Sequence, residues 1–363
     1  MKQRLTPRAG FGYIPPTVNE PKSNPAAAPV KDQLPVGVVG CGRMGRLHAR
    51  AYSQIPCARL VGVFDADLDA ARAVADEFSC GVFKTIDEML AAVKAVTIAV
   101  PTQHHPDLAE PFLRRGIPCL IEKPLASDVA HGKRILDAAQ RGGAVVQVGH
   151  IERFNPAFIA MQRLNIKPRF IEVTRISPLT FRSIDVGVVL DMMIHDIDIV
   201  LQLAGSNVSK IDAVGVSVIG QVEDICNARL TFENGCVANI TASRLALKTE
   251  RRIRVFSADA YVSLDYQKRY GIVARRGENL GAIRDAVARI RAGEIDDISQ
   301  LNFMDLIQVE ELAIDESDPL RAELESFIDA ASGRCAPAVT AAEGLAAVEL
   351  ANRIVQSIAP QTL

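Results

Sequence analysis

The sequence lacks an apolar stretch long enough to cross a membrane, and it lacks an excess of charge of either sign. A bilayer-spanning helix needs roughly 18–20 consecutive apolar residues, and no uncharged apolar run approaches that length. The 41 Lys and Arg residues are dispersed and are balanced by 43 Asp and Glu residues, which gives a formal net charge of −2. The basic patch that nucleic-acid binding needs is therefore not indicated. We expect neither a membrane nor a nucleic acid among the partners.

Paired cysteines and a signal sequence are missing as well. The seven Cys residues are scattered and include no CxxC pair, which argues against a zinc ribbon or a disulfide scaffold and fits a reducing cytoplasm. Cys41 and Cys119 are expected to be small buried residues. Residues 1–33 carry basic groups but no apolar h-region, so they are not predicted to be a secretory signal. Their Pro, Ala and Asn content predicts a disordered, Pro-rich tail.

Between residues 34 and 150, short apolar strands alternate with helices. Such alternation is typical of a doubly wound parallel sheet, so residues 34–150 are predicted to form a Rossmann domain. Ser127 is the expected N-cap of the last helix. The expected strands are residues 35–40, 58–64, 95–100, 118–122 and 144–149, and the expected helices are residues 43–54, 67–78, 106–115 and 127–141, with a short helix opening at 85–90.

After His150 the pattern changes to a succession of strands. Asn234-Gly235 between two of them is a strong signal for a hairpin turn. Strands joined by hairpins form an antiparallel sheet, so residues 151–319 are predicted to be a substrate-binding α+β domain with a largely antiparallel open sheet. A charged amphipathic helix is expected near 281–292, and two further helical patterns follow at 320–332 and 341–357.

The segment "VVGCGRMG" places Gly40, Gly42 and Gly45 in a G-x-G-x-x-G pattern between a strand and a helix. In that context the glycines permit a tight turn, a close approach of the backbone to a pyrophosphate, and close packing of helix on strand. The helix N-terminus then offers free N–H groups to the phosphates. Arg43 and Met44 lie in the same loop and are expected to contact the cofactor.

Asp65 ends the next strand, about 20 residues further on. A carboxylate at this point bonds the ribose hydroxyls and repels a 2′-phosphate. The sequence therefore predicts NAD as the cofactor rather than NADP, although the guanidinium of Arg43 offsets part of that repulsion.

Two other strand ends are rich in polar residues, "AVPTQHH" at 99–105 and "IEKP" at 121–124. Ligands of open α/β sheets bind outside the carboxyl ends of the strands. The expected cofactor contacts here are Pro101, Thr102, His105, Glu122 and Lys123. Since they follow the strands, Glu122 and Lys123 are expected to emerge at the mouth of a cleft instead of being buried.

The Gly-rich turn, "EKPLA" about 80 residues later, and the D-x-x-x-H element from Asp191 to His195 occur in this order within residues 35–357. Together they resemble the Gfo/Idh/MocA family of sugar and cyclitol oxidoreductases. The resemblance implies an NAD-dependent enzyme in which Lys123, Asp191 and His195 form the catalytic group and contact the substrate. It also implies that residues 320–363 pack back on the Rossmann domain. Through the open sheet, family members commonly form dimers or tetramers, so a homo-oligomer is expected.

The chemistry of these residue types agrees with the implied roles. Residues four apart share a helix face, so Asp191 and His195 can point into one cleft. Oxidation of a secondary alcohol releases a hydride from carbon and a proton from oxygen, and histidine titrates close enough to neutral pH to accept that proton. Lys123 can hydrogen-bond the same oxygen. Which of Lys123 and His195 takes the proton first stays open, and Asp191 orients the substrate or supports one of them.

"VGHIERFNPAF" and "DMMIHDIDIV" resemble one branch of the family, the UDP-N-acetylglucosamine 3-dehydrogenases. This implies oxidation of the sugar 3-hydroxyl and a downstream aminotransferase, in a route to 2,3-diamino sugars for lipid A. Arg153 and Asn155 are the expected substrate contacts, since an arginine fork matches a diphosphate. Arg153 has an alternative role, pairing with Glu152 or with a helix end. Arg175 and Arg182 are weaker candidates.

Two other interpretations stay open. One is an NAD-dependent dehydrogenase of another sugar or cyclitol, and the other is a dinucleotide-sensing regulator without turnover. The presence of the three catalytic residues favours an enzyme. His104, His105 and His150 show no compact ligand spacing, so no metal is expected. Asp196 and Asp198 are expected to be solvated or to cap a helix.

Overall fold

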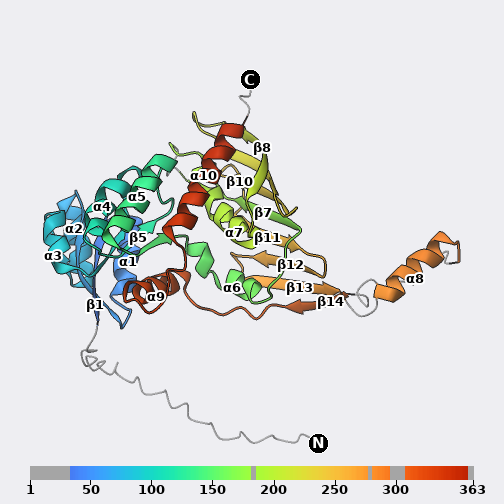
Figure 1. Ribbon diagram of the computed structural model, residues 1–363, viewed down its shortest axis with the longest axis horizontal. Coiled ribbons are helices and arrows are strands. Elements are labelled where there is room, and N and C mark those ends of the chain that lie inside the picture. The colour runs from blue at the N-terminus through green and yellow to red at the C-terminus, as the bar shows by residue number, and fades with distance from the viewer. Residues whose placement is uncertain (1–32, 181–184, 277–279, 295–306, 359–363) are drawn as a thin grey trace, which may run out of the picture. The chain divides into compact units, whose positions relative to one another are not determined.

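The computed structural model describes residues 33–180, 185–276, 280–294 and 307–358, which form two β-sheets and the helices around them (Figure 1). Residues 1–32 of the expected tail and Arg182 lie outside the described residues. Among the helices of the described residues, none combines the length and apolar character that crossing a membrane requires.

The first sheet has six parallel strands in the order β3-β2-β1-β4-β5-β6. This confirms the predicted doubly wound sheet. The strand order reverses between β1 and β4, and ligands bind at such a reversal. The strands are β1 (Leu34–Val39), β2 (Ala58–Phe64), β3 (Gly81–Val82), β4 (Ala95–Ile98), β5 (Cys119–Glu122) and β6 (Val146–Gly149), and the helices are α1 (Arg43–Tyr52), α2 (Leu68–Phe78), α3 (Ile86–Ala92), η1 (Thr102–His104), α4 (His105–Arg114) and α5 (Val129–Gly142).

The predicted N-cap of helix α5 is wrong. Helix α5 is capped by Asp128, whose side chain accepts a hydrogen bond from the backbone N–H of His131 at 2.9 Å, and Ser127 lies one residue before the cap. Asp and Ser are comparable caps, so adjacent candidates cannot be ranked from sequence. Cys41 and Cys119 are buried, as predicted.

The second sheet has eight strands in the order β14-β13-β12-β11-β7-β10-β9-β8. Only β7 and β10 pair in parallel, so the predicted largely antiparallel sheet is confirmed. The Asn234-Gly235 turn joins β9 to β10, and Gly235 has a φ of +82°, which suits glycine. The strands are β7 (Phe170–Ile176), β8 (Val208–Val216), β9 (Ile225–Phe232), β10 (Val237–Ser243), β11 (Glu250–Phe256), β12 (Ala260–Asp265), β13 (Tyr270–Arg276) and β14 (Ile307–Glu311).

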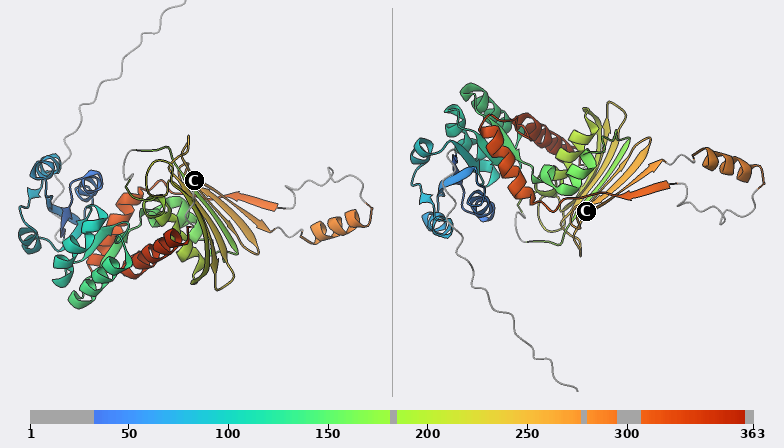
Figure 2. Two further views of the ribbon diagram at one scale, coloured as in Figure 1. Left: turned by 90° about the horizontal axis from the view of Figure 1, so that it is seen from above. Right: turned by 90° about the horizontal axis from the view of Figure 1, so that it is seen from below.

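Helices pack against the sheet through its buried, alternating residues. Helix α7 packs on β7 and β10, and helix α6 packs on β12 (Figure 2). A π-helical turn, η3, runs directly into α7 and carries the Asp191 region. The elements of this part are η2 (Ile151–Phe154), α6 (Pro156–Gln162), η3 (Val189–Met193), α7 (Ile194–Ala204) and α8 (Leu280–Arg291).

The last two helices contact elements of the first sheet. Helix α9 (Pro319–Ala331) packs against α1, and its Leu324, Phe327 and Ile328 join the core beside β1. Helix α10 (Ala341–Ser357) packs against both α5 and α7. These contacts place residues from the end of the described chain close to the carboxyl ends of the parallel strands.

Candidate functional site

The Gly-rich turn after β1 forms a cradle. Gly40 has a φ of +96°, and a Cβ there would lie 2.4 Å from the carbonyl oxygen of Ala99. A Cβ on Gly45 would lie 1.7 Å from the carbonyl oxygen of Gly40, so helix α1 packs directly on the turn. By contrast, a Cβ on Gly42 would meet nothing within 4 Å. Gly42 also caps α1 without a side-chain hydrogen bond, which leaves N–H groups free for phosphates.

A cavity of about 560 Å³ lies beside this turn and is lined by Gly40, Gly42, Asp65 and Pro101 among others. Asp65 is partly exposed. Its Oδ2 accepts a hydrogen bond from the N–H of Cys41 at 2.6 Å, and its Oδ1 accepts one from the N–H of Asp67 at 2.9 Å. These bonds fix the carboxylate at the edge of the cavity. The open space at Gly42 and the carboxylate of Asp65 fit the phosphates and the ribose of a dinucleotide.

Two of the predicted cofactor contacts lie elsewhere. Thr102 begins η1 and lines neither this cavity nor the one described next. His105 is 1% exposed, and its ring nitrogens lie 3.0 Å from the carbonyl oxygen of Val100 and 3.1 Å from that of Pro124. Burial lowers the pKa of His105. His105 does not line the cavity, and its ring joins the loops after β4 and β5.

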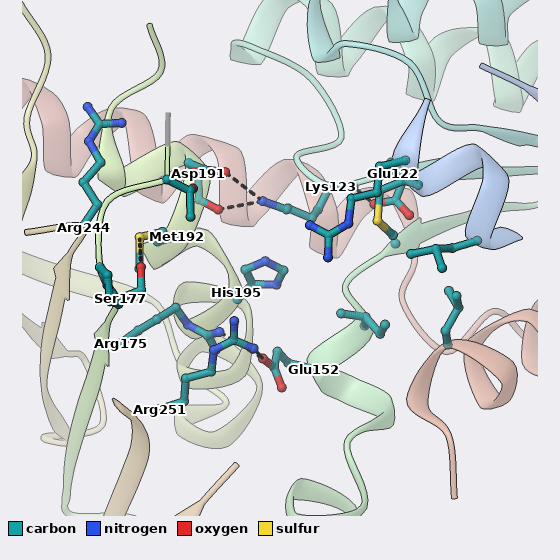
Figure 3. Close-up of a pocket in the computed structure, with 18 residues that line it drawn as sticks. Glu122, Lys123, Glu152, Arg175, Ser177, Asp191, Met192, His195, Arg244 and Arg251 are labelled. Atoms are coloured by element: carbon teal, nitrogen blue, oxygen red, sulfur yellow. Dashed lines mark hydrogen bonds and ion pairs between the residues drawn. The ribbon is translucent and has the colours of Figure 1, made fainter. Parts of the chain in front are cut away.

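A second cavity of about 720 Å³ brings together Lys123, Asp191 and His195 (Figure 3). Nζ of Lys123 donates hydrogen bonds to the backbone oxygen of Asp191 at 2.6 Å and to its Oδ1 at 3.3 Å. Asp191 lies in the π-helical turn η3 and His195 in the first turn of α7. The predicted shared orientation of Asp191 and His195 agrees with this geometry. Arg43 and Met44 line the same cavity.

The electrostatic surroundings of His195 favour the neutral imidazole. Burial lowers its pKa well below the ordinary value, and the positive charges of Lys123 and Arg175 act in the same direction. The imidazole is therefore neutral at pH 7. Its Nδ1 has no hydrogen-bond partner within the described residues. In Figure 3 the ring lies between the Lys123–Asp191 pair and the guanidinium groups of Arg175 and Arg251.

The expectation that Glu122 emerges from the strand end is wrong. Glu122 is only 9% exposed. Its Oε1 faces the buried His48 and lies 2.8 Å from Nε2 of that ring. Its Oε2 accepts a hydrogen bond from the backbone N–H of Lys123 at 3.3 Å. Burial favours the neutral acid, but His48 and Lys123 outweigh this effect and lower the pKa of Glu122. Glu122 still lines the second cavity at its inner wall.

Arg153 and Asn155 do not line the two cavities, contrary to the predicted substrate contacts. Arg153 is 8% exposed and donates two hydrogen bonds to Asp198, at 2.6 and 2.7 Å, and a longer one to Glu343. Asn155 caps α6 through Ala157 N–H and is held by a buried acid. The alternative partner Glu152 is wrong, because Arg153 pairs with Asp198 and, at 3.2 Å, with Glu343 in the first turn of α10. Long-range ion pairs of this kind leave no local sequence signal.

The arginines that line the second cavity differ in how firmly they are held. Arg175, a weaker candidate from sequence, is buried on β7 and bonds both oxygens of Asp196 at 2.7 and 2.8 Å and Glu152 at 2.9 Å. Burial opposes the charge, but these acids raise the pKa of Arg175, so it stays ionised. Asp196 and Asp198 are each 1% exposed, so the expectation that they are solvated is wrong.

Arg251 on β11 was not identified from sequence. Its side chain is 49% exposed, and NH1 lies 3.9 Å from Glu152 Oε1, which is beyond hydrogen-bond length. Burial and then the charge of Arg175 lower the pKa of Arg251. Other residues that line the cavity and were not identified are Leu47, Gly149, Ile151, Glu152, Ser177, Pro178, Thr180, Met192, Arg244 and Leu320. They lie on helices, turns, strand ends and loops far apart in the chain, and only the tertiary structure brings them together.

Comparison with known proteins gives consistent results. Residues 34–150 match the family model described as the oxidoreductase family, NAD-binding Rossmann fold, and residues 177–263 match the GFO/IDH/MocA C-terminal domain. The chain is 35% identical to a UDP-N-acetylglucosamine 3-dehydrogenase of Acidithiobacillus ferrooxidans over 295 residues, which are 81% of this chain and 87% of that protein. It is 30% identical to an inositol 2-dehydrogenase of Rhizobium meliloti over 341 residues, 89% of this chain and 96% of the other.

A solved structure of UDP-N-acetylglucosamine 3-dehydrogenase from Acidithiobacillus ferrooxidans superposes with a TM-score of 0.80 at 31% identity. The superposition covers 90% of this chain and 97% of that one. It extends across both sheets, so the likeness includes the elements that position the second cavity as well as the dinucleotide cradle.

Proposed function

Because this chain belongs to the Gfo/Idh/MocA family of NAD-binding oxidoreductases, we propose that it oxidises the 3-hydroxyl of UDP-N-acetylglucosamine to a ketone, with NAD as the hydride acceptor. The observation that carries this proposal is the second cavity, where Lys123, Asp191 and His195 converge and Arg251 offers a half-exposed guanidinium. The likeness to a UDP-N-acetylglucosamine 3-dehydrogenase over 81% of the chain supports the choice of substrate.

In the proposed mechanism, bound NAD supplies an electrophilic ring carbon that takes the hydride. Lys123 donates a hydrogen bond to the reacting oxygen and stabilises its developing negative charge. Asp191 keeps the ammonium group in place through the contacts at 2.6 and 3.3 Å. His195 is neutral and takes the proton from the oxygen, directly or by way of Lys123. The cradle at Gly42 and the carboxylate of Asp65 hold the dinucleotide.

Arg251 is the proposed contact for the diphosphate of the substrate. Glu152 lies at 3.9 Å and leaves the N–H groups of the guanidinium available on the cavity side. A guanidinium matches two phosphate oxygens at once. Arg175 lines the same wall but is held by Asp196 and Glu152, so its charge supports the field at the site while its donors are occupied.

The second candidate function is oxidation of an inositol-type cyclitol. The inositol 2-dehydrogenase of Rhizobium meliloti matches 89% of this chain, and the same Lys123, Asp191 and His195 chemistry serves both alcohols. A cyclitol has no phosphate, however, and gives Arg251 no anionic partner. The half-exposed guanidinium of Arg251 therefore favours the sugar nucleotide.

Further parts of the proposal concern the cellular setting. We propose that the ketone product passes to an aminotransferase, leading to 2,3-diamino sugars of lipid A, and that the reaction takes place in the cytoplasm. The open second sheet is the proposed surface of a homo-oligomer. Its side chains include exposed apolar groups such as Val214, Phe256, Tyr270 and Val309, and such groups favour association. A molar mass in solution equal to one chain would contradict the oligomer.

The test compares UDP-N-acetylglucosamine, N-acetylglucosamine and myo-inositol as substrates with NAD, in the wild type and in Arg251→Gln. Loss of a charged hydrogen bond costs about 1.5–3 kcal/mol, so we expect KM for the sugar nucleotide to rise about 10- to 150-fold. The matched control is Arg252→Gln, the neighbouring arginine on the same strand, whose NH1 lies 3.9 Å from Glu250. Faster turnover of myo-inositol than of the sugar nucleotide, with no effect of Arg251→Gln, would favour the second candidate.

A further inference from the structure

Behind Lys123, three titratable side chains from distant parts of the chain meet. They are His48 on α1, Glu122 at the end of β5 and Glu323 on α9, and they are 0%, 9% and 1% exposed. One nitrogen or oxygen atom of each lies within 4.8 Å of those of the other two. The cluster therefore joins the helix of the dinucleotide cradle, the strand end that carries Lys123, and a helix from the last part of the described chain.

Glu323 has no partner that would stabilise a negative charge. Neither of its carboxylate oxygens has a hydrogen-bond partner in the described part of the chain. Burial, and then the charge of Glu122, raise the pKa of Glu323 well above its ordinary value. A buried carboxyl group in this position keeps its proton, because the ionised form would be neither solvated nor paired.

We propose that Glu323 carries a proton at neutral pH, and that the triad formed by His48, Glu122 and Glu323 holds the backbone of Lys123 against helix α1. Without that proton, the carboxylates of Glu122 and Glu323 would face each other in a buried site. With it, Glu122 is the single carboxylate of the triad. Glu122 accepts a hydrogen bond from the Lys123 N–H at 3.3 Å, so a change of charge in the triad acts on the strand end directly.

Among the described residues, the neighbouring titratable groups do not offer Glu323 a positive charge or a hydrogen bond that could replace this proton. Tyr52 on α1 shares a hydrogen bond with Oγ1 of Thr97 at 2.8 Å, and the ammonium group of Lys123 is directed to Asp191. On the other side of Glu122, the ring of His105 is occupied by backbone carbonyl groups. His150, after β6, is buried, and burial lowers its pKa, so it is neutral.

The distance between His48 and Glu122 does not fit a metal ion held by the three side chains. Two ligands of one tetrahedral zinc ion, each about 2.0–2.2 Å from it, lie roughly 3.3–3.6 Å apart. Nε2 of His48 and Oε1 of Glu122 lie 2.8 Å apart. The two atoms are therefore closer together than two ligands of one zinc ion would be.

The triad makes stability depend on pH in a defined direction. In the unfolded chain Glu323 loses its proton above its ordinary pKa, whereas in the folded chain it keeps the proton to a higher pH. Across that window the folded state binds one proton more, so the folded state becomes less stable as the pH rises. The uncharged amide of Glu323→Gln removes this dependence.

The first test needs no substrate. Urea unfolding of the wild type and of Glu323→Gln is measured between about pH 5 and pH 9. The unfolding constant of the wild type relative to the variant should rise about tenfold per pH unit until the folded carboxyl group ionises. The matched control, Glu325→Gln, changes an exposed carboxylate on the same helix that pairs with Arg321 and should leave the ratio flat. A flat ratio for Glu323→Gln would overturn the proposal.

Two measurements on the wild type judge the proposal even where the variant does not fold. Infrared spectra at neutral pH should contain the carbonyl stretch of a protonated, buried carboxylic acid, and absence of that band would contradict the triad. Metal analysis of the purified protein, before and after dialysis against zinc, should show no stoichiometric metal. One equivalent of metal that Glu323→Gln removes would replace the protonated Glu323 with a metal site.

The link to Lys123 rests on the proposed function and is tested separately. With the substrate that the wild type oxidises, Glu323→Gln should shift the alkaline limb of kcat while KM for NAD stays within about twofold of the wild type. An unchanged alkaline limb would contradict the effect on Lys123. If the wild type oxidises no sugar or cyclitol, the proposed function fails, and the unfolding and infrared results still decide whether Glu323 is protonated.

Discussion

Replacing Asp65 with Asn should remove the preference of this protein for NAD over NADP. In the structure the Asp65 carboxylate lies at the edge of the dinucleotide cavity, held by the N–H groups of Cys41 and Asp67. A 2′-phosphate carries a charge of about −1.5 to −2. Two unit charges about 4 Å apart interact by about 1 kcal/mol in water. Since Asp65 is partly exposed, we use that lower value, which gives a repulsion of about 1.5–2 kcal/mol, or about 10- to 30-fold in affinity.

The assay is binding of NADH and NADPH, followed by the fluorescence of the reduced nicotinamide. The chain contains no Trp, so no tryptophan emission interferes. The wild type should bind NADH about 10- to 30-fold more tightly than NADPH, and Asp65→Asn should bring the ratio close to one. Asp69→Asn, which changes an exposed acid four residues further on, should leave the ratio unchanged. An unaltered ratio in Asp65→Asn, or a wild type that binds both equally because Arg43 compensates, would refute the electrostatic reasoning.

Three other outcomes are expected. Lys123→Ala should lower kcat about 10²- to 10⁴-fold and leave NADH affinity within about threefold; full turnover would remove Lys123 from the mechanism. Asp198→Asn leaves a buried guanidinium without its main partner and should cost about 3 kcal/mol in urea unfolding, whereas Glu325→Gln on the surface should cost less than about 0.5 kcal/mol. Gly42→Ala should weaken NADH binding at least about tenfold with an unchanged Tm, because its Cβ enters open space, while Gly45→Ala should lower Tm. Equal NADH affinity in Gly42→Ala would contradict the cradle.

The Rossmann sheet could be predicted from sequence because its determinants are local. Apolar strands of four to seven residues alternate with capped helices, and the glycines of the cradle occupy fixed positions between β1 and α1. The D-x-x-x-H spacing is local in the same way, because Asp191 lies in the turn η3 and His195 lies in the helix α7 that directly follows. Such features depend on neighbours a few residues apart, and sequence patterns report those neighbours well.

The misjudged residues are those whose partners are far away in the chain. Arg153 and Asp198 are 45 positions apart, and Arg175 and Asp196 are 21 apart. A charged residue on a helix or strand end is normally solvated, so these buried pairs had no local signature. Glu122 was expected to be exposed because its partner, His48, lies on helix α1, far from β5 in the sequence.

Glu323 is an intermediate case. Within α9 the buried residues include Glu323, Leu324, Phe327 and Ile328, a spacing that places the glutamate on the apolar face of the helix. Helical periodicity therefore marks Glu323 as a buried acid, and only the tertiary structure brings it to His48 and Glu122. A charged residue in phase with an apolar helix face is a signal that sequence analysis can use.

The central claim is that this chain transfers a hydride from the sugar 3-carbon of UDP-N-acetylglucosamine to NAD. The most direct measurement uses substrate deuterated at that carbon and mass spectrometry of the NADH formed, with substrate deuterated at the 4-carbon as the control. The account predicts one deuterium in NADH from the first substrate and none from the second, together with a keto sugar nucleotide that has lost two hydrogens. Deuterium transfer from the 4-carbon, or no NADH from this sugar nucleotide while NAD binds, would contradict it.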